Sequence, residues 1–326
     1  MGTTITVSGI SLVSLLAMVT AAEAQSGPTW GNTPQGISYA TPDETFKIDA
    51  GFGAMYLRGD EKVMSGNYTV SHLIWESVVP VLRGSMSLNM GNGLSIGAEG
   101  SVAGLGTSYM EDYDWLKGDD RFENWSHRSQ HPDTSLDHFW SGAVSLGYEL
   151  VRDQTAVVRA HGGFKYTDLQ WTARGGSYVY SSDGGFRDQV GNFTPGEPGI
   201  TYRQQLPEMF LGVDGEERYG DIRVGGLLRG GVTFLSVATD DHWMRNLRFV
   251  DDLYVAPTFA AGADVGFALG SNAELTFAAR YDHVFEQRGD TKYYNIATGN
   301  QTGAAANAAA GALRSATVTA GLSGKF

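Results

Sequence analysis

Two pairs of ionisable side chains could carry out acid–base chemistry, because the members of each pair are two residues apart. Asp112 and Asp114 end an extended, glycine-rich segment, and Asp240 and His242 stand where a strand-like run meets a polar loop. In a β-strand this spacing puts both members of a pair on one face. Adjacent carboxyls raise the pKa of one of them, so that it can accept a proton near neutral pH. An aspartate can orient a histidine and stabilise its charged form.

Solvated loop residues also show this spacing, so the elements that carry the two pairs decide between the interpretations. From Phe46 onward the chain alternates apolar and polar residues with almost no helical period. Such alternation, with aromatic residues toward segment ends, is typical of a transmembrane β-barrel, although a soluble sandwich also alternates. An export signal and the terminal Phe326 favour the barrel. The clearest segments are residues 46–56, 140–150, 253–269, 275–285 and 317–326.

The connections alternate between short turns and long polar loops, as in bacterial outer-membrane barrels. We therefore predict an all-β fold, a transmembrane antiparallel β-barrel of about ten strands with long extracellular loops. Glu99 and Arg229 break the simple alternation, which bulges near glycines would explain. We expect turns at residues 90–93, 152–154, 215–217 and 270–272, and loops at 58–67, 111–135, 175–199, 239–251 and 287–312, the last with a flexible alanine-rich part at 304–312.

This arrangement predicts that the two pairs lie on opposite walls of one opening. If the N-terminus lies on the periplasmic side, odd-numbered strands run outward. Asp112 and Asp114 are then at the outer end of the third strand, and Asp240 and His242 at the outer end of the seventh. Four strands apart in a ring of about ten is nearly diametric. Glu61 lies at the top of the first strand and shares its inward parity. The opening is then acidic and would attract cationic chains.

The composition and the N-terminus restrict the class of protein. Residues 5–20 are apolar and Ala22-Glu-Ala24 precedes Gln25, so we expect a signal peptide at residues 1–24 and one barrel domain at residues 25–326. The chain has no cysteine, which excludes disulfides and cysteine-based metal sites. The formal charge of −13 argues against nucleic-acid binding. We expect no metal, no organic cofactor and a monomer.

Other candidate motifs give weaker evidence for a functional site. His127, His131 and Asp133 could suggest a metal site, but no further ligand accompanies them, and Pro132-Asp133 is typical of a loop turn. The closely spaced glycines at 175–176 lack the Lys-Ser/Thr of a phosphate loop. No serine or threonine has a recognisable nucleophile motif around it.

Four stretches resemble the omptin family of outer-membrane aspartyl-type endopeptidases, in that family's order. They are Met110-Glu-Asp-Tyr-Asp-Trp115, His131-Pro-Asp-Thr134, Ala173-Arg-Gly-Gly-Ser-Tyr-Val-Tyr-Ser-Ser182 with Gly185-Phe-Arg-Asp188, and Asp240-Asp-His242. The resemblance covers nearly the whole mature chain. It implies a barrel in the outer membrane of a Gram-negative bacterium, with an active site in an extracellular groove.

The resemblance also implies cleavage of polypeptides next to basic residues. Asp112, Asp114, Asp240 and His242 match the family's catalytic positions. Water held between the Asp pair and His242 would attack the peptide, with His242 as general base and Asp240 as the residue that orients it. No acyl-enzyme is implied. Glu61 matches the acid that receives the basic side chain before the scissile bond.

This sequence departs from the family's substrate-binding pattern at two positions. A second acid of the specificity pocket aligns with Ala238, which predicts a weaker preference for Arg or Lys. An acid that contacts the residue after the scissile bond aligns with His127, which argues against a dibasic preference.

Lipopolysaccharide is the activator that the family implies, bound through its phosphates to basic residues on the barrel wall. Two of those positions fall on Asp168 and Gln205 here, while Arg203 and Lys165 lie nearby. Partners are therefore peptides or proteins with basic residues, outer-membrane lipid and lipopolysaccharide. The alternative is a non-enzymatic outer-membrane barrel that acts as a surface-binding protein or adhesin, which the intact Asp-x-Asp and Asp-x-His pairs disfavour. An open pore is disfavoured because about ten strands leave a narrow, filled lumen.

Overall fold

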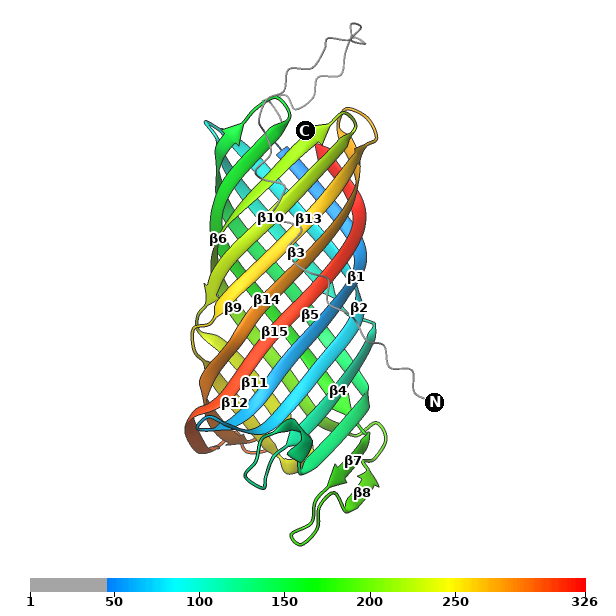
Figure 1. The fold of residues 1–326 in the computed structure, drawn as a ribbon, viewed down its shortest axis with the longest axis vertical. Helices are drawn as coiled ribbons and strands as arrows, with labels where there is room; N and C mark the ends of the chain where they lie inside the picture. Colours follow the sequence, from blue (N-terminus) through cyan, green and yellow to red (C-terminus); the bar gives the residue numbers. More distant parts are fainter. Residues whose placement is uncertain (1–45) are drawn as a thin grey trace, which may run out of the picture. The chain divides into compact units, whose positions relative to one another are not determined.

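The computed structural model describes residues 46–326, which form a closed antiparallel β-barrel (Figure 1). The expected signal peptide at residues 1–24 lies outside the described residues. The described strands are β1 (Phe46–Ser65), β2 (Tyr68–Gly91), β3 (Leu94–Ala103), β4 (Thr107–Asp114), β5 (His127–Arg152), β6 (Ala156–Arg174), β7 (Ser177–Tyr180), β8 (Gln189–Asn192), β9 (Pro198–Tyr219), β10 (Ile222–Thr233), β11 (Ser236–His242), β12 (Leu247–Leu253), β13 (Pro257–Ala268), β14 (Ala273–Asn295) and β15 (Gln301–Lys325). Two short 3-10 helices are η3 (Phe122–Asn124) and η4 (Trp243–Arg245).

The strand pairings close the sheet into a ring. β3 and β4 both lie between β2 and β5, so they are two parts of one ring strand. In the same way, β10 and β11 both pair with β9, and β12 and β13 both pair with β14. β15 pairs with β1 and completes the ring, while β7 and β8 form a hairpin between β6 and β9. Among residues 46–326 the fifteen strands, without that hairpin and with three ring strands each divided in two, therefore occupy ten ring positions, which confirms the predicted barrel.

A bulge at Leu105 reverses which residues of the third ring strand face the interior. Between β3 and β4, residues 104–106 stand opposite only two residues of β2, and Leu105 has a left-handed φ of 60°. An extra residue of this kind moves every later side chain to the other face. Glu99 therefore points inward before the bulge, and Met110 and Asp112 point inward after it.

The seventh ring strand contains a bulge of the same kind. Between β10 and β11, residues 234–236 stand opposite two residues of β9, and Leu235 has a φ of 51°. Arg229 therefore faces inward before the bulge, and Ala238 and Asp240 face inward after it. The bulges predicted from Glu99 and Arg229 are therefore present, the first between two glycines and the second without an adjacent glycine. One bulge precedes each candidate catalytic pair along its strand.

One predicted turn is wrong. Residues 215–217 lie inside β9, and the turn falls at Gly220, which has a φ of 62°. The acids around 215 are not turn residues, because they point into the lumen and pair with cations: Asp214 contacts Arg159, and Glu216 contacts Lys47.

The predicted loops are shorter than expected, because the strands continue past them. β1 runs to Ser65, and β14 and β15 are separated only by residues 296–300. The alanine-rich part at 304–312 is not a flexible loop but belongs to β15, and Ala309 and Ala310 are buried. Likewise Pro132 and Asp133 lie within β5 rather than in a turn. Polar alternating residues above the membrane therefore form strands.

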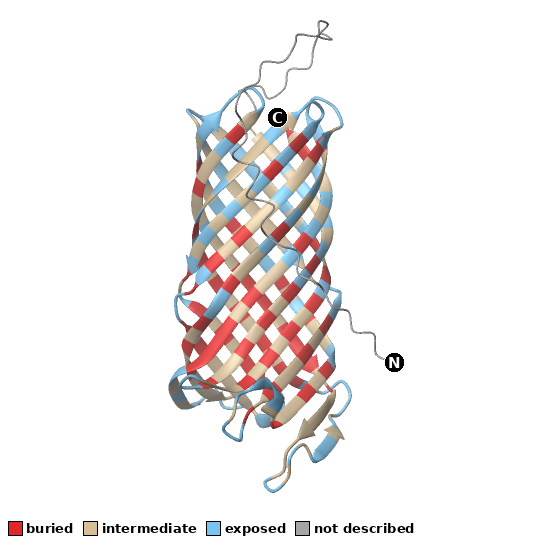
Figure 2. Ribbon diagram, in the orientation of Figure 1, coloured by how far each residue is buried: buried red, intermediate tan, exposed pale blue. Residues whose placement is uncertain are grey.

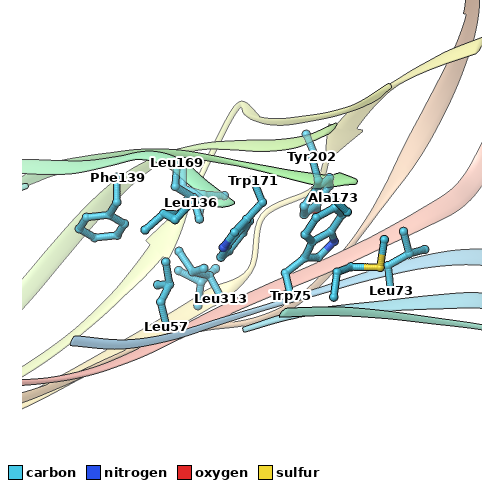
Figure 3. Packing of buried hydrophobic residues seen from close by; sticks show 14 of the residues in the cluster. Leu57, Leu73, Trp75, Leu136, Phe139, Leu169, Trp171, Ala173, Tyr202 and Leu313 are labelled. Carbon is cyan, nitrogen blue, oxygen red and sulfur yellow. The ribbon is translucent and has the colours of Figure 1, made fainter. Parts of the chain in front are cut away.

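An aromatic layer crosses the barrel interior. Trp75 stacks on Trp171 with ring centroids 5.9 Å apart and on Tyr202 at 5.8 Å (Figure 3). Leu57 and Leu313 complete the layer from β1 and β15. Buried residues gather in the half of the barrel that carries β7 and β8, the lower half in Figure 2. This layer forms a floor beneath the end where the candidate site lies.

Ion pairs line the lumen on the other side of this floor. Arg280 contacts both Glu99 and Asp282 at about the length of ordinary hydrogen bonds, and Arg229 also contacts Glu99. Arg223 binds Glu274 at 2.8 Å. These ion pairs narrow the interior of the barrel and leave a cavity among them.

Large apolar side chains form a band on the outer surface. Phe52, Val78, Leu146 and Leu211 are all exposed although they lie on regular strands. A contiguous apolar band of this kind faces lipid in outer-membrane barrels. On β1 the band extends to Tyr56, so residues from about 60 onward lie beyond it. Residues 46–326 contain no helix long and apolar enough to span a membrane.

Candidate active site

The two predicted pairs lie on opposite sides of the ring. Asp112 and Asp114 end β4, which pairs with β2 and β5. Asp240 and His242 end β11, which pairs with β9 and β12. β5, β6 and β9 separate the two along one side of the ring, as the strand count predicted. β4 and β11, which carry the two pairs, both lie toward the end of the barrel that carries the β7–β8 hairpin (Figure 1).

Asp112 and Asp114 form a pair of interacting carboxyls. Burial and the charge of Asp114 raise the pKa of Asp112 well above its usual range. Burial also raises the pKa of Asp114, against the opposing effects of Ser71 and nearby cations. Ser71 on β2 donates a hydrogen bond of 2.9 Å to Oδ1 of Asp112. The pair can therefore hold a proton at a pH where isolated carboxyls cannot.

Asp240 and His242 are in direct contact. Nε2 of His242 lies 2.7 Å from Oδ2 of Asp240, and the imidazole packs edge-on against Phe249 at 5.2 Å. With Nε2–H donating to the carboxylate, Nδ1 carries the lone pair that can accept a proton. The other oxygen of Asp240, Oδ1, is buried and has no hydrogen-bond partner among the described residues.

The two pairs act on each other across the opening. The charge of Asp240 contributes to the raised pKa of Asp112, and His242 acts in the opposite direction on Asp114. Such effects require that the groups lie near one another. The fold therefore brings together all four side chains that the sequence singled out.

Glu61 lies deeper, beside the aromatic floor. It is only 4% exposed and accepts a 3.1 Å hydrogen bond from Nε1–H of Trp75. Burial, together with the neighbouring carboxylates of Asp240 and Asp251, raises its pKa well above the usual range. Its predicted inward orientation at the top of the first strand is confirmed.

The two predicted substrate-binding positions occupy different parts of the opening. Ala238 is 1% exposed and faces inward on β11, two residues before Asp240. His127 begins β5 directly opposite Asp114. Its ring is tilted against that of Tyr180 in the β7–β8 hairpin, with ring centroids 4.8 Å apart, and its Nδ1 lies 2.9 Å from Oγ of Ser126.

Four residues near the pairs escaped the sequence analysis. Ser71 contacts Asp112. The charge of Arg245 in η4 acts to lower the pKa of both Asp112 and Asp114. Burial and this Asp pair raise the pKa of Tyr180. Asp251 on β12 lies near Asp240, whose charge contributes to the raised pKa of Asp251, and near Glu61, whose pKa Asp251 helps to raise. Tyr180 lies in a motif that the sequence flagged, but Ser71 and Asp251 have no local signal, because cross-strand register alone brings them to the site.

The predicted lipopolysaccharide-related positions lie on the outer wall, with one exception. Asp168 and Arg203 form an ion pair there, with Nη2 2.5 Å from Oδ2, and Gln205 contacts Tyr166. Lys165 points into the lumen and binds Asp282 at 2.9 Å, so it cannot substitute on the wall.

His131 does not take part in a metal cluster. Its Nδ1 lies 2.6 Å from the carbonyl oxygen of Gly175 and its Nε2 lies 2.9 Å from Ser129. Within residues 46–326 no group of three or more His, Cys, Asp or Glu is arranged to hold a metal ion.

Comparison with known proteins points to one family. The profile of the Omptin family matches residues 42–326. Protease 7 of Escherichia coli K12 is 28% identical over 262 residues, which cover 78% of this chain and 82% of that protein. The plasminogen activator of Yersinia pestis is 27% identical over 305 residues, which cover 92% and 96% of the two chains.

A solved structure agrees with these sequence matches. The crystal structure of the outer membrane protease OmpT from Escherichia coli superposes with a TM-score of 0.80 at 26% identity, over 88% of this chain and 98% of that one. The shared barrel and the named activity of the relatives favour an enzyme over the non-enzymatic alternative. The chain therefore belongs to the omptin family and is a β-barrel protease of the Gram-negative outer membrane.

Proposed function

We propose that this protease hydrolyses polypeptides next to basic residues, using water activated between the Asp112–Asp114 pair and the Asp240–His242 pair. The observation that carries this proposal is the Asp240–His242 contact of 2.7 Å facing a coupled carboxyl pair across one opening. With the active site at the end that carries the β7–β8 hairpin, beyond the lipid-facing band, the opening faces the cell exterior.

In the proposed reaction His242 is the general base. Nδ1 removes a proton from the water while the water oxygen bonds to the peptide carbonyl carbon. The carboxylate of Asp240 stabilises the imidazolium that forms, as an orienting carboxylate does in other hydrolases. The proton then passes to the peptide nitrogen as the carbon–nitrogen bond breaks, which gives one carboxylate and one amine. The enzyme forms no covalent bond with the substrate.

The Asp pair holds the other side of the water. One ionised carboxylate accepts a hydrogen bond from the water, and the raised pKa of Asp112 allows a second proton to be shared within the pair. Ser71 fixes the orientation of Asp112 through its 2.9 Å hydrogen bond. Water held in this way lies close to the attacking position before the substrate reacts.

The acidity of the opening supports a preference for basic substrates. Glu61, Asp240 and Asp251 are each less than 10% exposed and gather on one side of the opening. A substrate Lys or Arg side chain would relieve their mutual repulsion.

Lipopolysaccharide is the proposed activator. On the outer wall, Arg203 keeps a side chain that is 39% exposed, so it can reach a lipid phosphate. Asp168 already neutralises part of its charge. We therefore expect this chain to hold lipopolysaccharide more weakly than a wall with two free cations would.

The test uses the purified, refolded barrel supplied with lipopolysaccharide and an internally quenched peptide that contains a single arginine. Asp112→Asn and His242→Ala should each abolish cleavage, while the heat-modifiable mobility of the folded barrel persists. Asp133→Asn, an exposed acid on β5, is the matched control and should keep full activity. Full activity of the two site variants would overturn the mechanism. Cleavage in H₂¹⁸O should place one label in the new carboxylate.

A further inference from the structure

The inward acids near Ala238 have no lysine or arginine beside them. Among the described residues, Glu61, Asp240 and Asp251 form no ion pair with any lysine or arginine. Their sequence neighbours differ: Asp241 binds Arg248 at 2.5 Å and Asp252 binds Lys292 at 2.6 Å, both on the outer wall. Buried charges are normally paired.

Unpartnered polar atoms concentrate at the same place. Oδ1 of Asp251 and Oδ1 of Asp240 are fully buried and accept no hydrogen bond from the described residues. Oε1 of Gln204 and Oγ of Ser236 are also buried without a partner. Buried polar groups nearly always have partners, so a cluster of exceptions indicates a site for a ligand group that brings donors.

The strand register explains how these groups converge. Ala238 on β11 stands directly opposite Asp251 on β12 and directly opposite Gln204 on β9. Side chains of such partners emerge about 4.5–5.5 Å apart on the same face. Because Ala238 ends at a methyl group, the side chains of Asp251 and Gln204 flank an inward position that no polar group of β11 fills.

We propose that Asp251 supplies the second carboxylate of the specificity pocket and, together with Glu61, receives the cationic side chain of the substrate residue before the scissile bond. The proposal rests on the function proposed above and deepens it. Ala238 leaves room for that side chain, so the acid has moved to the neighbouring strand rather than been lost. The preference for Arg or Lys is then retained, contrary to the weaker preference that Ala238 by itself predicts.

The experiment compares two peptides that differ at one residue, arginine or its neutral isostere citrulline before the scissile bond. The wild-type protein should favour arginine strongly in kcat/KM. Asp251→Asn keeps the shape of the side chain and should lower the arginine-to-citrulline ratio about tenfold or more, the value of one charge-assisted hydrogen bond. The loss should appear mainly in KM, because Asp251 does not touch the reacting atoms.

Two further variants complete the test. Asp252→Asn removes the adjacent outward acid and should leave the ratio unchanged. Ala238→Asp combined with Asp251→Asn places a carboxylate on β11 directly opposite position 251 and should restore the arginine-to-citrulline ratio. It also tests the proposal if Asp251→Asn alone fails to show the heat-modifiable mobility of a folded barrel.

The outcomes separate this proposal from the proposed function. If the wild-type protein cleaves neither peptide, the proposed function fails. If the wild-type protein favours arginine and folded Asp251→Asn keeps the full ratio, the role of Asp251 is overturned while the proposed function stands. An unrestored ratio in the folded double variant would also count against the proposal.

Discussion

Nε2 of His242 lies 2.7 Å from Oδ2 of Asp240, although the two residues are only two apart on one strand. Both side chains therefore emerge on the same face of β11 and contact each other without help from another element. With the carboxylate as acceptor, this contact places the proton on Nε2 and leaves a lone pair on Nδ1, the atom that the proposed mechanism uses as the base. The bulge at Leu235 turns this face toward the opening.

Asp240→Asn should lower kcat about a thousandfold or more while KM changes little. An asparagine amide can donate to Nε2 and so favour the tautomer with the proton on Nδ1, as in the corresponding change of a serine-protease triad. Steady-state kinetics on the arginine peptide measure this effect. Asp241→Asn is the control, because Asp241 faces outward and pairs with Arg248. Retained kcat in Asp240→Asn would contradict the assigned role.

Activity should fall as the pH drops, because one carboxyl of the Asp pair must stay ionised to hold the water. Burial and the charge of Asp114 raise the pKa of Asp112, so the acid limb of kcat/KM lies above the usual range of a carboxyl. Ser71→Ala removes a hydrogen bond that lowers this pKa, and the limb should move to higher pH. Ser135→Ala, on the outer wall, should leave the profile unchanged. An unmoved limb in Ser71→Ala would argue against the pair as the titrating group.

The substrate-free barrel should lose stability as the pH rises through about 7. Burial raises the pKa of Asp251 to about 7, with Asp240 and Asp252 also contributing, while Thr291 acts in the opposite direction. Between its ordinary pKa and 7 the folded state holds a proton that the unfolded state releases, so stability is complete below this window and falls across it. Glu61 and Tyr202 also face this region and shift in the same direction.

Asp251→Asn should therefore stabilise the substrate-free barrel at pH 8 and flatten the pH dependence of urea unfolding. Asp252→Asn, which loses only an exposed ion pair, should change little. A barrel that is less stable at pH 5 than at pH 8 would contradict this prediction.

His127→Asp should create a preference for a basic residue after the scissile bond. His127 lies directly opposite Asp114 in the strand register, so an acid there would face the part of the substrate beyond the Asp pair. The ratio of kcat/KM for lysine over glutamate at that position should rise about tenfold. His127→Asn removes the ring without adding charge and should not produce this rise. An unchanged ratio in His127→Asp would place this subsite elsewhere.

Asp168→Ala should lower the concentration of lipopolysaccharide needed for half-maximal activity. Removing this carboxylate frees the Arg203 guanidinium, which it now binds through two nitrogens, for a lipid phosphate. Arg203→Ala should have the opposite effect. Asp137→Ala, another acid of the same outer wall, tests whether any loss of negative charge suffices. Equal activation of all variants would exclude Arg203 as the phosphate ligand.

The sequence was sufficient for the barrel and for the placement of the two pairs. Alternation of period two reports which face of a strand is buried, and counting strands to Asp112 and Asp240 put them on opposite walls. The sequence-based prediction failed outside the membrane, where residues 304–312 and Pro132-Asp133 were expected to be loops but belong to strands. Outside the lipid the strands no longer carry a purely apolar face, so polar alternation there is indistinguishable from a loop.

The tertiary structure alone located the bulges and added Asp251 to the acids of the opening. A single left-handed residue, Leu105 or Leu235, moves every later side chain to the other face, and only the register with β2 and β9 reveals it. Strand register also explains why Asp251 could not be predicted. It lies far along the chain from Glu61, and only the pairing of β11 with β12 brings it to the same part of the interior. Sequence therefore determines the period of each strand, whereas contacts between strands depend on register, which is a property of the closed barrel.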